Sequence, residues 1–324
     1  MTAFDATDLF NLGWIAARQE STYGTRNGAG TTRWVGIAQS AVMRRVPKLI
    51  PLGGIRDSRI GAGAGHLEVR TMEEVELIGQ IQNAWPFYAA LGKISTTGVN
   101  PYTHAITILR SATGGTDTYL PAFTMEALYQ KTTPTQVSVL GSVAKTLTCN
   151  FPIDDIAKFT LNMAGQAEGS ASTAPTENIL APYGAYNTDI QIDSVNGTFT
   201  SGASVKGLNS VDMTIDNNLK IEGEFNTKLI RRSYQGNLRD GISGTINRKY
   251  LDSDLIALAD GTPFSMQVQM TRGANDYIYL TLQNCIADPL ERTMNYENQV
   301  ENTPLRFFAN SIQVDAKDAN SAYT

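Results

Sequence analysis

From Glu74 onward the chain is a succession of short segments in which apolar and polar residues alternate, separated by Gly, Asn and Asp. Alternation with a period of two places the apolar side chains of a strand on one face, and turn residues end each strand. Examples are THAITIL, VAKTLTCNF, KFTLNMA, SVDMTID, LKIEGEF, FSMQVQM and YIYLTLQNC. Helical spacing is confined to residues 8–18, 86–92 (PFYAALG) and 252–261 (DSDLIALADG). The sequence therefore predicts a mainly β fold, a β-sandwich or barrel with short flanking helices.

The length of the chain predicts more than one domain, because 324 residues exceed the usual domain of roughly 100 to 200 residues. Residues 1–60 combine Gly, Thr and Arg with weak periodicity, which is typical of an extended arm with little core of its own. Residues 166–184 are rich in Ser, Ala, Thr and Pro and form the best linker. We therefore expect an N-terminal arm, a β domain over 61–165, and a second β domain over 185–324.

The two expected domains share a pattern of Gly, any residue and Ile, followed by a short helical stretch ending in Ala, Leu and Gly. Gly79 and Ile81 carry this pattern in the first half, and Gly244 and Ile246 repeat it 165 residues later. An offset of about half the chain predicts an internal duplication with two domains in tandem. The alternative is a chance match of short motifs.

The charge of the chain argues against a protein that binds nucleic acid through phosphate contacts, since the net charge is −5 and only 18% of the residues are charged. Residues 1–60 nevertheless hold eight bases and four acids, so the arm is basic and the body acidic. Such an arm could be attracted to the body of another copy, although ordinary solvated charge explains it equally well. The candidate contact residues of the arm are Arg33, Arg44, Arg45 and Lys48.

Histidine and cysteine are too scarce for most metal and nucleophile sites. His66 and His104 are the only histidines, and neither has Cys or His at ligand spacing. Cys149 and Cys285 lie in apolar strand patterns, which favours buried reduced thiols over a disulfide. We predict no metal site.

No group of residues indicates catalysis or a cofactor. The carboxylates at 73–76 and at 154–155 are explained by a strand edge and by a turn. The glycines of IGAGAGHLEV (60–69) lack the G-x-G-x-x-G spacing, and no G-x-S-x-G motif occurs. We therefore predict no enzyme, no catalytic residues and no cofactor.

Two of the strand patterns present polar faces of Thr, Asn and Asp. These faces carry Thr146, Thr148 and Asn150 in one segment and Asp212, Thr214 and Asp216 in another. Asn217-Asn218 after the second segment suits a tight hairpin turn. A solvated sheet face is the simple explanation of both patterns.

Several of these stretches, in this order, resemble the major tail tube proteins of tailed phages and related tailed viruses. They are ARQESTYGT (17–25), the Gly-x-Ile strand with its short helix, SVAKTLTCNF with KFTLNMAGQ, SVDMTIDNN, and SGTINRKYLDSDLIALADGTPFSMQVQM. The resemblance covers most of residues 15–290. It implies a structural virion protein that stacks as rings into a hollow tail tube, through which DNA is ejected into the host.

The resemblance also implies partners and positions. It makes Thr146, Thr148, Asn150, Asp212, Thr214 and Asp216 candidates for lining the lumen, past which DNA slides without specific binding. The basic arm residues would contact the next ring. Single-domain members form rings of six chains, so a duplicated chain would form a trimeric ring with pseudo-hexameric symmetry. Further partners would be other tail proteins and, during assembly, the tape measure protein.

The N-terminal residues and the hydropathy of the chain indicate where in the cell the protein is made and assembled. Asp5 and Asp8 stand where a signal peptide needs bases, and no stretch reaches the ~18 apolar residues of a membrane span. We expect assembly in the host cytoplasm, residence in the virion tail, and no membrane contact. The competing hypotheses are a tail terminator or decoration protein, a surface adhesin, and a β-sandwich hydrolase.

Overall fold

The protein is described by a computed structural model, in which the defined regions are residues 14–28, 33–36, 38–51, 66–109, 119–129, 135–169, 173–176, 180–193, 197–223, 225–234, 241–248, 261–288, 304–321 and 323. Within these residues strands dominate, accompanied by one α-helix and one short 3₁₀ helix. The prediction of a mainly β fold is confirmed. All pairings between its named strands are antiparallel. The strands β14 and β15 form a sheet of their own, and the large sheet formed by the others is open in the described chain.

The elements of the first half are β1 Trp14–Gln19, β2 Arg33–Trp34, β3 Ala38–Pro51, β4 His66–Gln80, α1 Trp85–Leu91, β5 Gly92–Thr97, β6 Tyr102–Ile108, β7 Phe123–Tyr129, β8 Thr135–Pro152, β9 Lys158–Gly165 and β10 Ala167–Gly169. Those of the second half are η2 Ala185–Asn187, β11 Thr188–Asp193, β12 Ala203–Ser204, β13 Leu208–Asp216, β14 Lys220–Gly223, β15 Ile230–Tyr234, β16 Ile242–Arg248, β17 Phe264–Gly273, β18 Asp276–Ala287 and β19 Leu305–Asp318.

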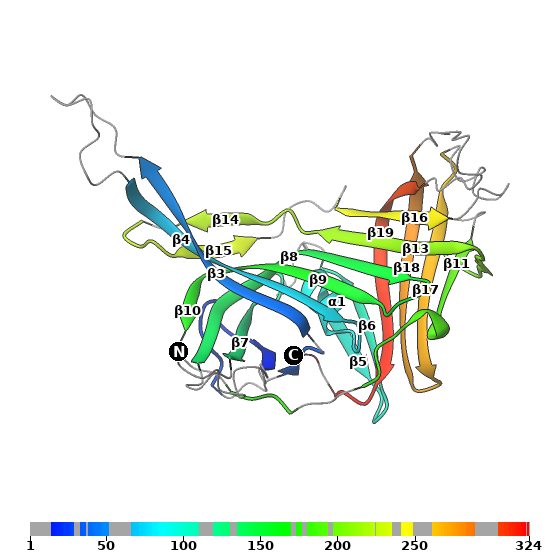
Figure 1. The fold of residues 1–324 in the computed structure, drawn as a ribbon, viewed down its shortest axis with the longest axis horizontal. Helices are drawn as coiled ribbons and strands as arrows, with labels where there is room; N and C mark the ends of the chain where they lie inside the picture. The colour runs from blue at the N-terminus through cyan, green and yellow to red at the C-terminus, as the bar shows by residue number, and fades with distance from the viewer. Residues whose placement is uncertain are drawn as a thin grey trace, which may run out of the picture.

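Six strands form a continuous row in the order β3, β4, β9, β8, β13, β16. We call them the central row. Beyond β16 the pairing passes to β19, and from there to β18, β17 and β11. Figure 1 shows β17 and β18 running across the direction of β8 and β13. The central row therefore joins the two halves of the chain in one sheet.

β8 belongs to two parts of the sheet. Its first half pairs with β7 and β10, and from Val143 onward it pairs with β9 and β13. The change occurs at Gly141, whose φ of 65° lies in the left-handed region. A Cβ at this position would lie 2.9 Å from Gln166 Cβ and 3.1 Å from Tyr23. Glycine thus lets β8 bend where the chain is tightly packed.

The helix predicted over 86–92 is confirmed as α1, and every residue of it is buried. Pro86 stands in its first turn, and Gly92 ends it with a φ of 90°. α1 packs against β8, β6 and β5, and Trp85 and Phe87 are fully buried in the core. Each such side chain contributes about 1.5–3 kcal/mol by leaving water. The other helix predicted in this repeat, over 252–261, lies outside the described residues except for Gly261.

The helical stretch considered over residues 8–18 is wrong for its described part, because Trp14–Gln19 is a strand. It pairs with β7 along its whole length, and Ile15, Ala16 and Ala17 are all buried. Burial on both faces removes the alternation that identifies a strand, so adjacent apolar residues look helical. Part of the predicted arm therefore lies inside the sheet rather than loosely against it.

The tight hairpin turn predicted at Asn217-Asn218 is also wrong. β13 does not fold back on β14; it pairs with β8 and β16, while β14 pairs with β15. Asn217 is fully buried, and its Nδ2 donates hydrogen bonds of 3.0 Å to the carbonyls of Ala90 and Ala144. The side chain satisfies backbone groups of α1 and β8, which explains an Asn in the core.

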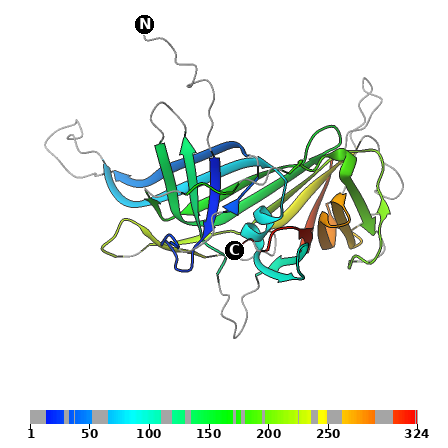
Figure 2. The same cartoon turned by 90° about the horizontal axis from the view of Figure 1, so that it is seen from below.

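Two antiparallel ribbons extend beyond the central row at the same end of the molecule: β3 with β4, and β14 with β15 (Figures 1 and 2). They are connected where the N–H of Thr71 in β4 donates a 2.7 Å hydrogen bond to the carbonyl of Lys228. Lys228 also lies 3.7 Å from Glu68. These contacts hold the second ribbon beside the first.

Candidate functional site

The structure brings the six polar positions singled out in the sequence onto one face of the central row. β8 and β13 are neighbours, and their register places Thr146 opposite Asp216, Thr148 opposite Thr214, and Asn150 opposite Asp212. All six side chains are half-buried. The residues that alternate with them along the two strands are among the most buried in the protein: Leu147, Cys149, Val211, Met213 and Ile215. We call this surface the polar face.

Hydrogen bonds run across the strands of the polar face. Asn150 Nδ2 donates to Asp212 Oδ1 at 2.5 Å, and the hydroxyls of Thr148 and Thr214 lie 3.3 Å apart. In β16, Asn247 donates to the second oxygen of Asp212 at 3.0 Å. Cross-strand polar pairs of this kind stabilise register by a few tenths to about 1 kcal/mol each. The face is thus ordered by its own side chains.

Several positive side chains beside the polar face are paired with carboxylates. In β3 and β4, which β9 separates from β8, Arg44 binds Glu74 at 2.6 Å. At the start of β9, Lys158 binds Asp155 at 2.5 Å. Asp212, by contrast, accepts its hydrogen bonds from the neutral amides of Asn150 and Asn247. The middle of the face therefore presents hydroxyls, amides and carboxylates.

Three of the four basic arm candidates lie on β3. Arg44 and Arg45 are exposed but bind acids of β4, Arg45 through a 2.6 Å contact with Glu68. Lys48 is exposed, and its backbone lies opposite Arg70. Arg33 lies on β2, where its backbone pairs with Ala17. The structure therefore places Arg33 apart from the other three, and two of those are partly neutralised within their own chain.

A model of the phage tail tube protein family matches residues 13–320, which is nearly the whole chain. The chain belongs to this family. It is therefore a structural protein of the virion tail. A search of curated proteins finds none that matches the sequence.

The segment ARQESTYGT of the tail tube protein forms a buried polar cluster that the sequence did not reveal as such. Glu126 in β7 is fully buried and binds Arg18 at 3.3 Å and Arg26 at 2.8 Å. It also accepts a 2.6 Å hydrogen bond from the N–H of Thr173. A buried carboxylate needs such partners. The available signal was Arg18, a charged residue directly after the apolar run of β1.

Glu20 of the same segment is buried beside the bend of β8. Its carboxylate accepts hydrogen bonds from the N–H groups of Gly24 and Gly141 and from the hydroxyl of Thr124. Burial raises the pKa of Glu20, and these hydrogen bonds offset part of the effect. The glutamate therefore ties the N-terminal segment to β7 and β8.

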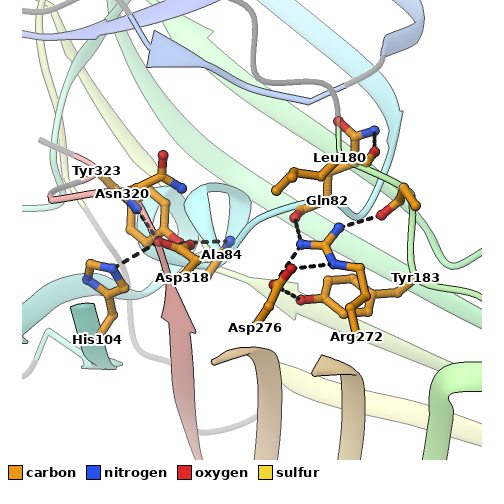
Figure 3. A network of polar contacts seen from close by, with 11 residues as sticks. Gln82, Ala84, His104, Leu180, Tyr183, Arg272, Asp276, Asp318, Asn320 and Tyr323 are labelled. Atoms are coloured by element: carbon orange, nitrogen blue, oxygen red, sulfur yellow. Dashed lines mark hydrogen bonds and ion pairs between the residues drawn. The ribbon is translucent and has the colours of Figure 1, made fainter. Parts of the chain in front are cut away.

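The two histidines and the acidic groups of the tail tube protein occupy structural positions where they are described. His104 is fully buried, and its Nδ1 lies 2.9 Å from Thr96 Oγ1. Its Nε2 lies 3.4 Å from Asp318 Oδ1 (Figure 3). The side chain of His66 lies outside the described residues. Glu73 is buried, which raises its pKa together with the nearby charge of Glu168. Within the described part of the chain, no three metal-ligand side chains come together.

A second polar network in Figure 3 connects the predicted linker to β17 and β18. Arg272 binds Asp276 at 2.8 Å and Gln82 O at 2.9 Å. Its guanidinium lies 4.2 Å from the ring centre of Tyr183, whose pKa is raised by burial. Tyr183 is therefore held in place by Arg272 and Asp276, although the composition of residues 166–184 predicted a linker.

Both cysteines are buried and free, as their apolar surroundings predicted. Burial raises the pKa of Cys285 to about 12 and also raises the pKa of Cys149. The only α-helix in the described residues is far too short to cross a bilayer.

Proposed function

We propose that copies of this tail tube protein polymerise as stacked rings into a hollow tube, the conduit for DNA ejection into the host, with the polar face towards the lumen. The observation that carries the proposal is the register of β8 and β13, which gathers Thr146, Thr148, Asn150, Asp212, Thr214 and Asp216 on one face. The opposite face of the same strands is the buried core. A single sheet can thus form both the wall and its lining.

The chemistry of the polar face suits the passage of DNA. Phosphates bind tightly where Lys and Arg can displace their counterions. Neutral hydroxyls and amides offer no such exchange, and the carboxylates of Asp212 and Asp216 repel phosphate. DNA would therefore slide past this surface without specific binding.

The edge of the central row supports closure between copies. Among the described residues, β3 pairs with β4 only, so its second edge of fourteen residues is open. Long open edges lead to pairing with another chain unless they are covered. A ring in which sheets of neighbouring copies join would cover this edge and close a barrel.

We also propose that the chain is a tandem duplication and that three chains form a pseudo-hexameric ring. The support is the equivalent setting of the two glycines from the repeated motif. Gly79 lies in β4 opposite Phe159 of β9, and Gly244 lies in β16 opposite Phe307 of β19. In the first half, β4 with Gly79 lies between β3 and β9. In the second half, β16 with Gly244 lies between β13 and β19.

Other tail proteins, and the tape measure protein inside the growing tube, would be the remaining partners, and assembly would take place in the host cytoplasm. The exposed Lys48 and the bases paired on β3 lie on a ribbon that projects from the body (Figure 1). A projecting ribbon can reach a neighbouring ring. Arg44, Arg45 and Lys48 remain our candidates for that contact, and Arg33 on the separate β2 is a weaker one.

Cryo-electron microscopy of the assembled protein tests the proposal. We expect hollow tubes, three chains in each ring, and Thr148 and Thr214 on the inner wall. Six chains per ring would contradict the trimeric arrangement but leave the tube intact. Protein that stays monomeric at high concentration, or tubes with the polar face outside, would contradict the proposed function itself.

A further inference from the structure

The tip of the β14–β15 ribbon carries an aromatic residue in an unusual setting. The side chain of Phe225 is 95% exposed, and Leu229 at the same tip is also exposed. Phe225 is the last residue of the alternating segment LKIEGEF, and the described part of its own chain does not cover it. Single exposed apolar residues are common, so Phe225 acquires meaning only with a matching surface.

A groove of about 300 Å³ lies between the end of β8, β11 and the start of β13. Its apolar lining includes Phe151, Ile153, Ile190, Val205 and Leu208. Ile153 is 50% exposed there. A groove of this volume and composition is suited to an aromatic side chain.

The groove and the tip lie at opposite ends of the molecule. Figure 1 shows β14 and β15 at one end of the long axis, and β11 with the start of β13 at the other. β13 alone, with nine residues, separates them by about 30 Å. A chain cannot place its own Phe225 in its own groove, so Phe225 can enter a groove of this kind only on a second copy.

Charge favours this pairing of ends. The ribbon 220–234 holds four bases and two acids. The groove is lined by one acid, Asp189, and one base, Lys206, and two more acids, Asp154 and Asp155, directly follow its lining residue Ile153. Asp154, next to the groove residue Ile153, and Lys220 on the ribbon are both exposed. Opposite charges around an apolar anchor steer association and set its direction.

We propose that Phe225 of one copy inserts into the groove between β8, β11 and β13 of the next copy. The contact joins two different surfaces, so it repeats head to tail, and it extends an open-ended assembly where the repeat does not close into a ring. Because β13 leads from the groove to the ribbon, the copies follow one another along the strands of the central row. The inference rests on the proposed tube. It identifies Phe225 and the groove as the two surfaces through which successive copies contact each other.

Cysteine cross-linking tests the contact directly. In the variant Phe225→Cys with Ile153→Cys, oxidation of assembled protein is expected to give a ladder of dimers, trimers and larger species on a denaturing gel. The native Cys149 and Cys285 are 0% exposed, so they are not expected to form cross-links of their own. Each single variant is the control and is expected to give no ladder. Tubes without a ladder would overturn the inference while leaving the proposed tube intact.

The variant Phe225→Asp gives a second readout that does not depend on cross-linking. Since this side chain is exposed, the variant is expected to fold with an unchanged melting temperature and to need a roughly tenfold or higher concentration to assemble. Val99→Asp is the matched control, because Val99 is 86% exposed in the turn between β5 and β6. Assembly of Phe225→Asp at the wild-type concentration would overturn the proposal, whereas wild-type protein that never assembles would contradict the tube.

Discussion

The carboxylate of Glu20 accepts a 2.8 Å hydrogen bond from the N–H of Gly141, the residue at which β8 changes its pairing partners. A segment near the N-terminus thereby fixes the bend of a strand 121 residues later. Gly24 and Thr124 donate to the same carboxylate. The bend positions the half of β8 that carries Thr146, Thr148 and Asn150, so Glu20 supports the polar face from a distance.

Replacing Glu20 by Gln should destabilise the fold. The amide NH₂ would face backbone donors, and a buried donor left without an acceptor costs about 1–3 kcal/mol. Urea unfolding at neutral pH measures the loss. Glu168→Gln, at an exposed position of β10, is the control and should stay within ~0.5 kcal/mol of wild type. An equally small effect of Glu20→Gln would show that its three hydrogen bonds do not stabilise the bend.

The pH dependence of Glu20 has a defined sign. Burial raises the pKa of Glu20 in the folded state above its ordinary value of 4.5, so the folded state binds the proton more tightly. The free energy of unfolding should therefore fall as the pH rises from about 4.5 through the raised pKa. Unfolding curves across this range should show a component of that slope in wild type that Glu20→Gln lacks.

Asp318 should show the opposite dependence. Burial alone would raise its pKa, but hydrogen bonds from His104, Tyr323 and the N–H of Asn320 outweigh it and lower the pKa below 3.8. Its stabilisation is present above pH 3.8 and is lost as the pH falls through the lowered pKa. Asp318→Asn should unfold more easily at pH 7 and lose less stability on acidification. Asp154→Asn, at an exposed position, is the control and should unfold as wild type does at pH 7.

Gly244→Ala tests the packing behind the repeated motif. A Cβ there would lie 2.4 Å from the ring of Phe307 and 2.5 Å from the carbonyl of Asp212. Overpacking of this kind costs about 1–3 kcal/mol, because the ring or the strand must shift. Gly273→Ala is the matched control, since a Cβ there meets nothing within 4 Å. Thermal unfolding should separate the two variants, and equal melting temperatures would contradict the tight contact with Phe307.

The sequence predicted which residues share a face of a strand, but it did not predict which strands lie side by side. Alternation in 143–151 and 211–216 placed Thr148 and Thr214 on polar faces, and both are confirmed as half-buried beside a buried core. Nothing in a period of two says that β8 lies beside β13, because the polar residues which that pairing brings together are more than sixty apart in the chain. The single polar face therefore emerged only from the structure.

The remaining differences arise where long-range contacts override local preference. β1 was mistaken for a helix because both of its faces are buried. Asn217 was mistaken for a turn residue because its side chain is used by Ala90 and Ala144, which lie far away in the chain. Glu126 is fully buried because Arg18 and Arg26 surround it. Partners of this kind are supplied by the fold and leave no local pattern.

A positive charge added to the polar face should make this surface bind DNA. Thr148→Lys places an ammonium group at the middle of this face, opposite Thr214. Assembled tubes of this variant should bind a short DNA duplex that wild-type tubes leave free, and added salt should abolish the binding, because it arises from phosphate contacts. Virions that carry the variant should eject DNA more slowly.

Thr148→Asn is the control for the loss of threonine, since an amide is neutral and can still hydrogen-bond to Thr214. Its tubes should leave DNA free at low salt, as wild-type tubes do. The comparison isolates charge from packing at one position. If Thr148→Lys tubes form normally and neither bind DNA nor slow its ejection, then β8 and β13 do not face the passing DNA, and the polar face belongs to another surface of the tube.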